Sequence, residues 1–133
     1  MIRAKALQYG MLAAVGALLA APAAQAAKPL KIGMTFQELN NPYFVTMQNA
    51  LREAAATIGA TVVVTDAHHD VSKQISDVED MLQQDIDILL VNPTDSTGIG
   101  SAINSAHAKG IVVVAVDANA NVVRRLQELR CRT

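Results

Sequence analysis

Cysteine and aromatic residues are scarce in this chain of 133 residues. It has one cysteine, Cys131, no tryptophan, and only two tyrosines and two phenylalanines. A single cysteine excludes an intramolecular disulfide, so an oxidising compartment would not stabilise the fold through one. The formal net charge of −1 gives no electrostatic reason to expect a nucleic acid or another anionic partner. The expectation is one small domain without disulfides.

Catalytic and nucleotide-binding motifs are also missing. Gly98-Ile99-Gly100 lacks the third glycine of a dinucleotide fingerprint, because Ile103 occupies that position. No GxxxxGK[ST] phosphate loop and no G-x-S-x-G nucleophile motif occurs, and no nucleophile is paired with a base. We therefore expect a protein that is not an enzyme and that needs no cofactor or metal.

Residues 1–26 have the layout of a secretory signal peptide. Arg3 and Lys5 give a positive start, Met11–Ala21 is an apolar run, and an A-x-A cleavage motif ends at Ala26. The apolar run is shorter than the roughly 20 residues that a membrane-spanning helix needs. We predict cleavage after Ala26 and export, which argues against a nucleic-acid partner.

Apolar runs of strand length alternate with segments of helical spacing in the rest of the chain. The runs are continuous, which is typical of strands buried on both faces of a parallel sheet. They cover residues 30–36, 61–65, 86–91 and 111–116. Between them, apolar residues recur at helical intervals in segments 44–58, 75–82 and 99–106, and Gly59 and Gly110 are stop signals. The alternation predicts an α/β fold with a doubly wound parallel sheet, β-α-β-α-β-α-β, in strand order 2-1-3-4.

Capping residues stand at the starts of the predicted helices. Asn41 before Pro42 fits an N-cap followed by the first helical position. Ser72 is expected to cap the second helix, and Asp95 or Ser96 the third. These residues therefore have a structural explanation before any function is considered.

The loops after the four predicted strands are the expected site, because ligands of open parallel sheets bind beyond the carboxyl ends of the strands. In the first loop, Asn40 and Asn41 stand beside Tyr43 and Phe44. Amides donate and accept hydrogen bonds, and rings offer flat apolar faces, so the set suits a sugar. We expect at least one ring to stack on the ligand, although Phe44 also fits the apolar stripe of the helix.

Carboxylates follow the third and fourth predicted strands. Asp117 comes directly after the most apolar strand, where it could accept charge-assisted hydrogen bonds from vicinal hydroxyls. A capping role explains Asp95 without a ligand. The adjacent His68 and His69 predict no metal site, because neighbours on an extended segment point in opposite directions and no further ligand pair supports them.

Three segments carry a family pattern: KIGMTFQELNNPYFVTMQNALREAA, DILLVNPTDS and GIVVVAVD. With N-N-P-[YF]-F and N-P-T-D-S at this spacing, the stretch from Lys31 to Asn119 resembles the N-terminal lobe of periplasmic sugar-binding proteins of ABC transporters, of the ribose-binding type. The resemblance implies a non-enzymatic periplasmic protein that captures a monosaccharide, a pentose or a hexose, between two lobes. It further implies a membrane permease as partner, and a chemoreceptor is a second candidate partner.

The resemblance also implies which residues face the sugar. The main ones are Asn41, Tyr43, Phe44 and Asp117. The secondary ones are Asn40, Asp95 and Asn119. Position 118 is Ala118, where ribose-type members often have Arg, so the expected ligand is left open among a pentose, a hexose and a polyol.

The chain departs from the family pattern towards its end. The family has two lobes, whereas this chain is expected to contain only a partial N-terminal lobe, residues 27–120. We expect this lobe alone to bind sugar very weakly or not at all, and its last strand to form an open edge. Alternatives for the whole chain are a non-functional fragment and a ligand-independent module that engages a permease or a chemoreceptor.

Residues 121–133 form an atypical tail. They contain four arginines and Cys131 but no turn or capping signal. One interpretation is a short amphipathic helix, because apolar residues have roughly helical spacing. These residues are Val122, Val123, Leu126 and Leu129. The other, which we favour, is an out-of-frame sequence foreign to the domain.

Overall fold

A computed structural model describes residues 28–117 of the chain. The predicted signal peptide, Asn119 and the tail 121–133 lie outside the described residues. The elements are β1 (Lys31–Phe36), α1 (Pro42–Thr57), β2 (Thr61–Asp66), α2 (Val71–Gln83), β3 (Ile88–Val91), α3 (Gly100–Ala108) and β4 (Val112–Ala115). No helix in this part of the chain is long and apolar enough to cross a membrane.

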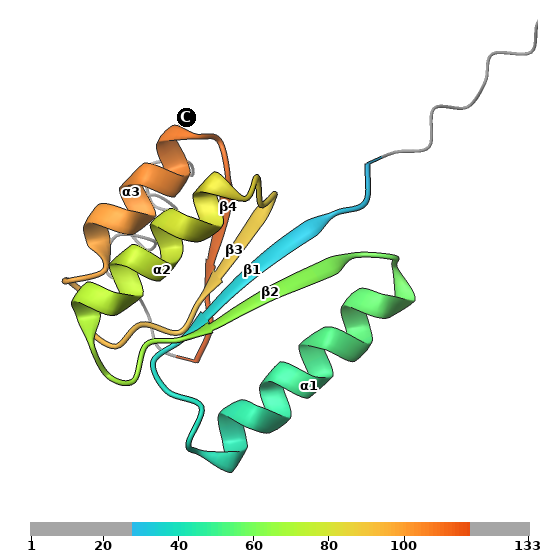
Figure 1. The fold of residues 1–133 in the computed structure, drawn as a ribbon, viewed down its shortest axis with the longest axis horizontal. Coiled ribbons are helices and arrows are strands. Elements are labelled where there is room, and N and C mark those ends of the chain that lie inside the picture. Colours follow the sequence, from blue (N-terminus) through green and yellow to red (C-terminus); the bar gives the residue numbers. More distant parts are fainter. Residues whose placement is uncertain (1–27, 118–133) are drawn as a thin grey trace, which may run out of the picture.

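The four strands form one parallel sheet in the order β2-β1-β3-β4, so the predicted α/β architecture and strand order are confirmed. Helices α2 and α3 lie together on one face of the sheet, and α1 is the helix of residues 28–117 that lies on the other (Figure 1). Alternate residues of a strand point to opposite faces, and a separate hydrophobic core lies on each face of the sheet.

The larger core lies between the sheet and the pair α2–α3. It joins Leu89 and Val91 of β3 to Val78 of α2 and Ile103 of α3, all of them fully buried. Gly33 of β1 allows α2 to approach closely. A Cβ at that position would lie 2.9 Å from the Sδ atom of Met81. This face of the sheet is therefore tightly packed.

The smaller core lies beneath α1. It consists of Met34 and Phe36 of β1 and Phe44 of α1, with partly buried neighbours around them. Ile58, expected on the apolar stripe of this helix, is instead its C-cap residue and is 68% exposed. The predicted stop signal is confirmed, since Gly59 follows with φ of 67°.

The start of α2 and the burial of β4 also differ from the sequence expectations. Ser72 does not cap α2; Asp70 does, and its Oδ1 accepts hydrogen bonds from the backbone N–H groups of Ser72 and Lys73 at 2.8 and 3.1 Å. The strand β4 is not buried on both faces within the described residues, because Val112 and Val114 are exposed. No described helix covers the side of β4 to which these two residues point.

Candidate functional site

Asn92, directly after β3, connects the loops at the carboxyl edge of the sheet. Its side chain is fully buried. The Oδ1 atom accepts a hydrogen bond from the backbone N–H of Gln37 at 3.2 Å. The Nδ2 atom donates to the carbonyl of Val116 at 3.3 Å and lies 3.4 Å from Oδ2 of Asp117. One amide therefore holds the loop after β1 beside the end of β4.

Gln74 of α2 holds Asn92 in turn. Its Nε2 donates to the carbonyl oxygen of Asn92 at 2.9 Å and to Oγ1 of Thr35 at 3.3 Å, while Oε1 accepts from the backbone N–H of Thr94 at 2.9 Å. Gln74 is fully buried, so these bonds replace those it would make with water. We call the side-chain amides of Gln74 and Asn92 the amide relay. Their hydrogen bonds hold the loops at the carboxyl edge of the sheet in place.

Sequence reasoning missed the amide relay. Asn92 is the first residue of the N-P-T-D-S motif, but the motif gave it no role of its own, and no pattern pointed to Gln74 as a partner. A signal was nevertheless present: Gln74 precedes Val78 by four residues, and so lies on the apolar face of α2. A buried amide on such a face must find partners.

The loop after β1 presents one exposed ring and one buried ring. Asn41 caps α1, because its Oδ1 accepts from the backbone N–H of Tyr43 at 3.0 Å. Tyr43 is 55% exposed, whereas Phe44 is 4% exposed and packs on Phe36 with a ring-centroid distance of 5.9 Å. The Tyr43 ring meets Phe44 edge-on at 5.3 Å. Phe44 thus supports the exposed ring from inside, and Asn40 beside it is exposed.

Asp117 is exposed at the end of β4, next to the amide relay. Its φ of 66° is in the left-handed region, which Asp tolerates better than most residues. No hydrogen bond among residues 28–117 joins it directly to Asn41 or Tyr43; the connection runs through Asn92 and Gln37. The structure therefore holds two predicted site loops at one edge, while Asn119 lies outside the described residues.

Asp95 has a structural role in the turn before α3. Its Oδ1 accepts hydrogen bonds from the backbone N–H groups of Thr97, at 2.9 Å, and Gly98. The bonds from Gly98 and Thr97 lower the pKa of Asp95 from its ordinary value of 3.8. The expectation that Asp95 or Ser96 is the N-cap of α3 is wrong, because that position is Ile99 and carries no side-chain bond.

His68 and His69 each lie beside a different carboxylate. Nδ1 of His68 lies 3.3 Å from Asp66, and Nε2 of His69 lies 3.2 Å from Glu38. Both residues have positive φ, so the segment is a left-handed turn and not extended as assumed. Within residues 28–117, no group of three or more His, Cys, Asp or Glu side chains is arranged to hold a metal ion.

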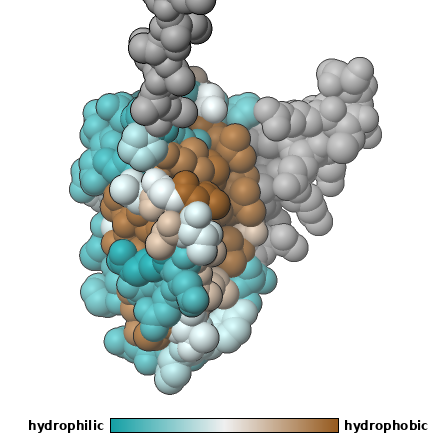
Figure 2. Space-filling view, turned by 90° about the vertical axis from the view of Figure 1, so that its right-hand side faces the viewer, coloured by the Kyte–Doolittle hydropathy of each residue, from teal (hydrophilic) through white to brown (hydrophobic). Residues whose placement is uncertain are grey.

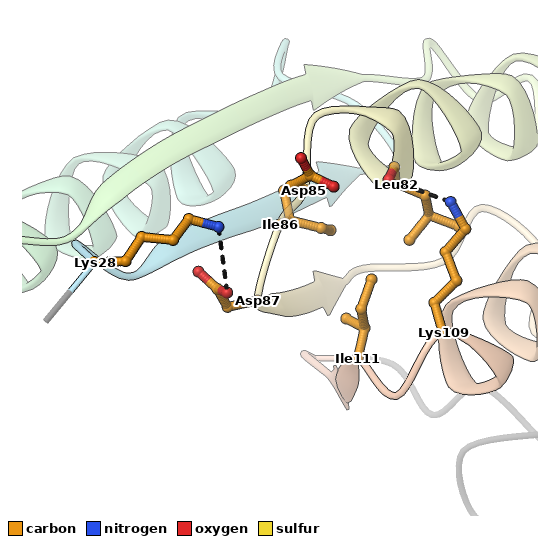
Figure 3. A pocket seen from close by; sticks show the side chains of 7 residues that line it. All are labelled: Lys28, Leu82, Asp85, Ile86, Asp87, Lys109 and Ile111. Atoms are coloured by element: carbon orange, nitrogen blue, oxygen red, sulfur yellow. Dashed lines mark hydrogen bonds and ion pairs between the residues drawn. The ribbon is translucent and has the colours of Figure 1, made fainter.

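A pocket of about 290 Å³ lies at the opposite end of the sheet, where the strands begin (Figure 3). Lys28 faces Asp87 across it at 4.0 Å, and Nζ of Lys109 donates to the carbonyl of Leu82 at 3.4 Å. Its lining lysines are thus engaged with neighbouring groups. The carboxyl edge, where exposed polar and aromatic groups converge, is the better candidate for a ligand site.

Comparison with known sequences identifies relatives of the chain. Residues 32–127 match the family model described as a periplasmic binding protein domain. The ribose import binding protein RbsB of Bacillus subtilis (strain 168) is 46% identical over 93 residues, which are 70% of this chain and 30% of that protein. RbsB of Escherichia coli (strain K12) is 34% identical over 104 residues, or 78% and 35% of the two chains. This chain spans about a third of the length of these relatives.

Solved structures of binding proteins are similar to the chain as well. A Mycobacterium smegmatis ABC transporter solute binding protein with bound glycerol superposes with a TM-score of 0.68 at 33% identity, over 71% of this chain and 33% of that one. The Caulobacter myo-inositol binding protein bound to myo-inositol gives a TM-score of 0.64 at 34% identity, with the same coverage. Because the family is one of binding proteins, the prediction of a non-enzymatic protein is confirmed. With its sheet in the order 2-1-3-4 and these relatives, the chain belongs to the periplasmic binding proteins, of which it carries part of one lobe.

Proposed function

We propose that this chain is the sugar-binding part of the N-terminal lobe of an ABC transporter solute-binding protein. Its role is to bind a monosaccharide in the periplasm for delivery to a membrane permease. The observation that carries the proposal is the buried Asn92 side chain, which holds Asp117 beside the loop after β1. Ligands of parallel sheets bind at that edge.

The exposed groups of the edge suit a sugar. The carboxylate of Asp117 accepts hydrogen bonds from vicinal hydroxyls, and the exposed ring of Tyr43 stacks on an apolar sugar face. The Nδ2 group of Asn41 supplies a donor, since its Oδ1 serves the helix cap. Phe44 contributes from beneath by holding Tyr43. Secondary contacts are assigned to Asn40, Asp95 and Asn119.

One lobe supplies only part of such a site. A ligand closes a two-lobed protein by binding the closed state better than the open one, and a single lobe has nothing to close on. We expect calorimetry of this chain with pentoses, hexoses and polyols to give very weak binding or none. A dissociation constant in the micromolar range would contradict this expectation.

A chimera tests the function itself. Residues 31–117 replace the matching segment of the Bacillus subtilis ribose import binding protein, which supplies the second lobe. We expect the chimera to bind at least one pentose, hexose or polyol. Asp117→Asn should weaken binding about tenfold or more, because hydrogen bonds to a charged group contribute about 1.5–3 kcal/mol. Asp80→Asn, at an exposed position of α2, is the matched control. A folded chimera that binds none of these sugars would refute the proposal.

The proposal extends to location and partners. Residues 1–26 direct export, and the periplasmic chain should begin at Ala27 by intact-mass measurement; a chain that retains Met1 in the cytoplasm would contradict it.

The sugar-loaded chimera should be retained by a matching permease in a pull-down, and by a chemoreceptor if the lobe surface serves both. Retention that does not depend on sugar would instead favour a ligand-independent interaction module.

A further inference from the structure

Two surface features have no role in the proposed site. Apolar residues gather in the middle of the face shown in Figure 2, and nothing within residues 28–117 identifies a partner for them. The other feature is the turn after β2, where His68 and His69 each lie beside a carboxylate. This turn has an identifiable partner, because it contacts the loop after β1.

The turn after β2 holds three consecutive residues of the segment that leaves β1. The backbone N–H of Ala67 donates to the carbonyl of Phe36 at 2.9 Å. The backbone N–H of His69 donates to the carbonyl of Gln37 at 2.8 Å. Nε2 of His69 lies 3.2 Å from Oε2 of Glu38. We call the contact between the side chains of His69 and Glu38 the loop clip.

The backbone of the turn has an uncommon conformation. His68 and His69 have φ of 51° and 59°, in the left-handed region that few residues other than glycine adopt. Such conformations are unfavourable and cluster at functional sites. Oδ1 of Asp66 accepts from the backbone N–H of His68 at 2.9 Å, and the N–H of Asp70 donates to the carbonyl of Ala67 at 2.9 Å. These bonds keep His69 in the conformation in which it meets the loop after β1.

The loop clip lies just before the residues proposed to face the sugar. Glu38 precedes the cap Asn41 by three residues and Tyr43 by five. Between Glu38 and Asn41, Leu39 and Asn40 make no hydrogen bond within residues 28–117. Within this part of the chain, the clip is therefore the last polar contact that holds the loop before α1 begins.

We propose that His69 is a positioning residue for the loop after β1, which its ion pair with Glu38 holds in place when the imidazole is protonated. The inference rests on the proposed function, in which that loop presents Asn41 and Tyr43 to a sugar. Histidine changes charge between about pH 5 and 8, and hydrogen bonds between charged groups are about twice as strong as neutral ones. The loop should thus be held more firmly at the acid end of that range.

Other charged groups near the clip have partners of their own. They are Asp66, His68 and Asp70 on the same turn, and Lys73 in the first turn of α2. Asp66 lies 3.3 Å from Nδ1 of His68, so that pair stays within the turn. Asp70 caps α2, and Nζ of Lys73 lies 2.7 Å from Asp77. Glu38 is the carboxylate that the facing loop offers to His69.

The pair of His68 and Asp66 is a matched control. Its side chains are 64% and 19% exposed, against 59% and 21% for His69 and Glu38. The control pair joins two residues of one turn, whereas the loop clip joins two loops. Only the loop clip should transmit a change of charge to the loop after β1.

Amide NMR spectra of the full chain test the proposal without any sugar. From about pH 5 to about pH 8, the signals of Asn40 and Tyr43 should move in the native chain. They should stay nearly fixed in His69→Asn, which keeps a residue tolerant of the left-handed backbone. At the acid end, exchange of the Tyr43 amide proton should be up to about fivefold faster in His69→Asn, the limit set by an exposed ion pair. His68→Asn should behave as the native chain does.

A second variant, His69→Lys, separates the charge from the imidazole. Lysine stays charged across this pH range, so the loop signals should remain near their acid-end positions throughout. Three results would overturn the proposal. The movement of the Asn40 and Tyr43 signals persists in His69→Asn; it disappears equally in His68→Asn; or His69→Lys gives the same spectra as His69→Asn.

The removal of the clip can also be made from the other loop. If His69→Asn does not fold, Glu38→Gln breaks the same ion pair with the same expected result. None of these spectra involves a sugar, so a failure here overturns the loop clip and leaves the proposed function standing. A chimera that binds no sugar would refute the proposed function and leave the loop clip standing.

Discussion

The two faces of the sheet are made by the same strands but differ in how completely they are covered. On the face of α2 and α3, Leu89 and Val91 are fully buried, whereas on the face of α1 the adjacent Leu90 is only partly buried and Val114 is exposed. All four are aliphatic residues in neighbouring strands. The difference shows that the placement of the helices, rather than the hydrophobicity of the strand, decides which residues stabilise the fold.

The largest expected effect comes from the neighbours Leu89 and Leu90. Leu89→Ala should lower the free energy of unfolding by about 2–5 kcal/mol, because it leaves a cavity in the packed core. Leu90→Ala should cost about 1–2 kcal/mol, since its side chain loses less contact. Urea denaturation of both variants measures the difference. Equal losses would mean that the two faces are equally covered in solution.

The unequal faces explain what the sequence could and could not predict. Continuous apolar runs were enough to predict four parallel strands and their order, because local pattern and the rules of strand connection determine both. The exposure of Val112 and Val114 was not predictable, since it depends on where α1 lies. The pattern of the run 111–116 is the same whether or not a helix lies above it.

Polar residues also divide into those whose role the sequence predicts and those whose role only the tertiary structure reveals. Asn41 was correctly predicted as a cap, because Pro42 marks the start of the helix beside it. Ser72 was predicted to cap α2, but Asp70, which is also a good capping residue, takes that position. The left-handed turn that includes His69 precedes it and determines where α2 begins. The bond from Gln74 to Asn92 joins positions 18 residues apart, so only the tertiary structure reveals it.

The second prediction compares two glutamines of α2, of which one is buried against the sheet and the other is exposed. Gln74→Leu should destabilise the chain by about 1–3 kcal/mol, even though it adds an apolar side chain to a buried position. The substitution leaves the carbonyl of Asn92 and the N–H of Thr94 without their partner. Gln83→Leu, at an exposed position of the same helix, should change stability by less than about 0.5 kcal/mol.

Urea midpoints distinguish the two glutamine variants, and backbone amide spectra show where the structure changes. In Gln74→Leu, the signals of Gln37 and Asp117 should shift, because Asn92 holds both. A Gln74→Leu variant as stable as the native chain, with those signals unmoved, would mean that the amide relay does not fix the carboxyl edge.

The smallest expected effect is at the entrance to α3, the helix that completes the covered face beside β4. Asp95 has a lowered pKa in the folded chain, because its carboxylate accepts hydrogen bonds from the backbone N–H groups of Gly98 and Thr97. A lowered pKa stabilises the folded state above the unfolded value of 3.8, and this contribution is lost as the pH falls through the folded value. The native chain should therefore lose stability relative to Asp95→Asn as the pH falls below 3.8.

Asn retains an acceptor oxygen, so the substitution removes the charge and keeps the turn. Because Asp95 is exposed, the difference should be small, and urea midpoints followed from neutral to acidic pH measure it. Parallel pH profiles for the two chains would show that the charge of Asp95 contributes nothing to holding α3 on the sheet.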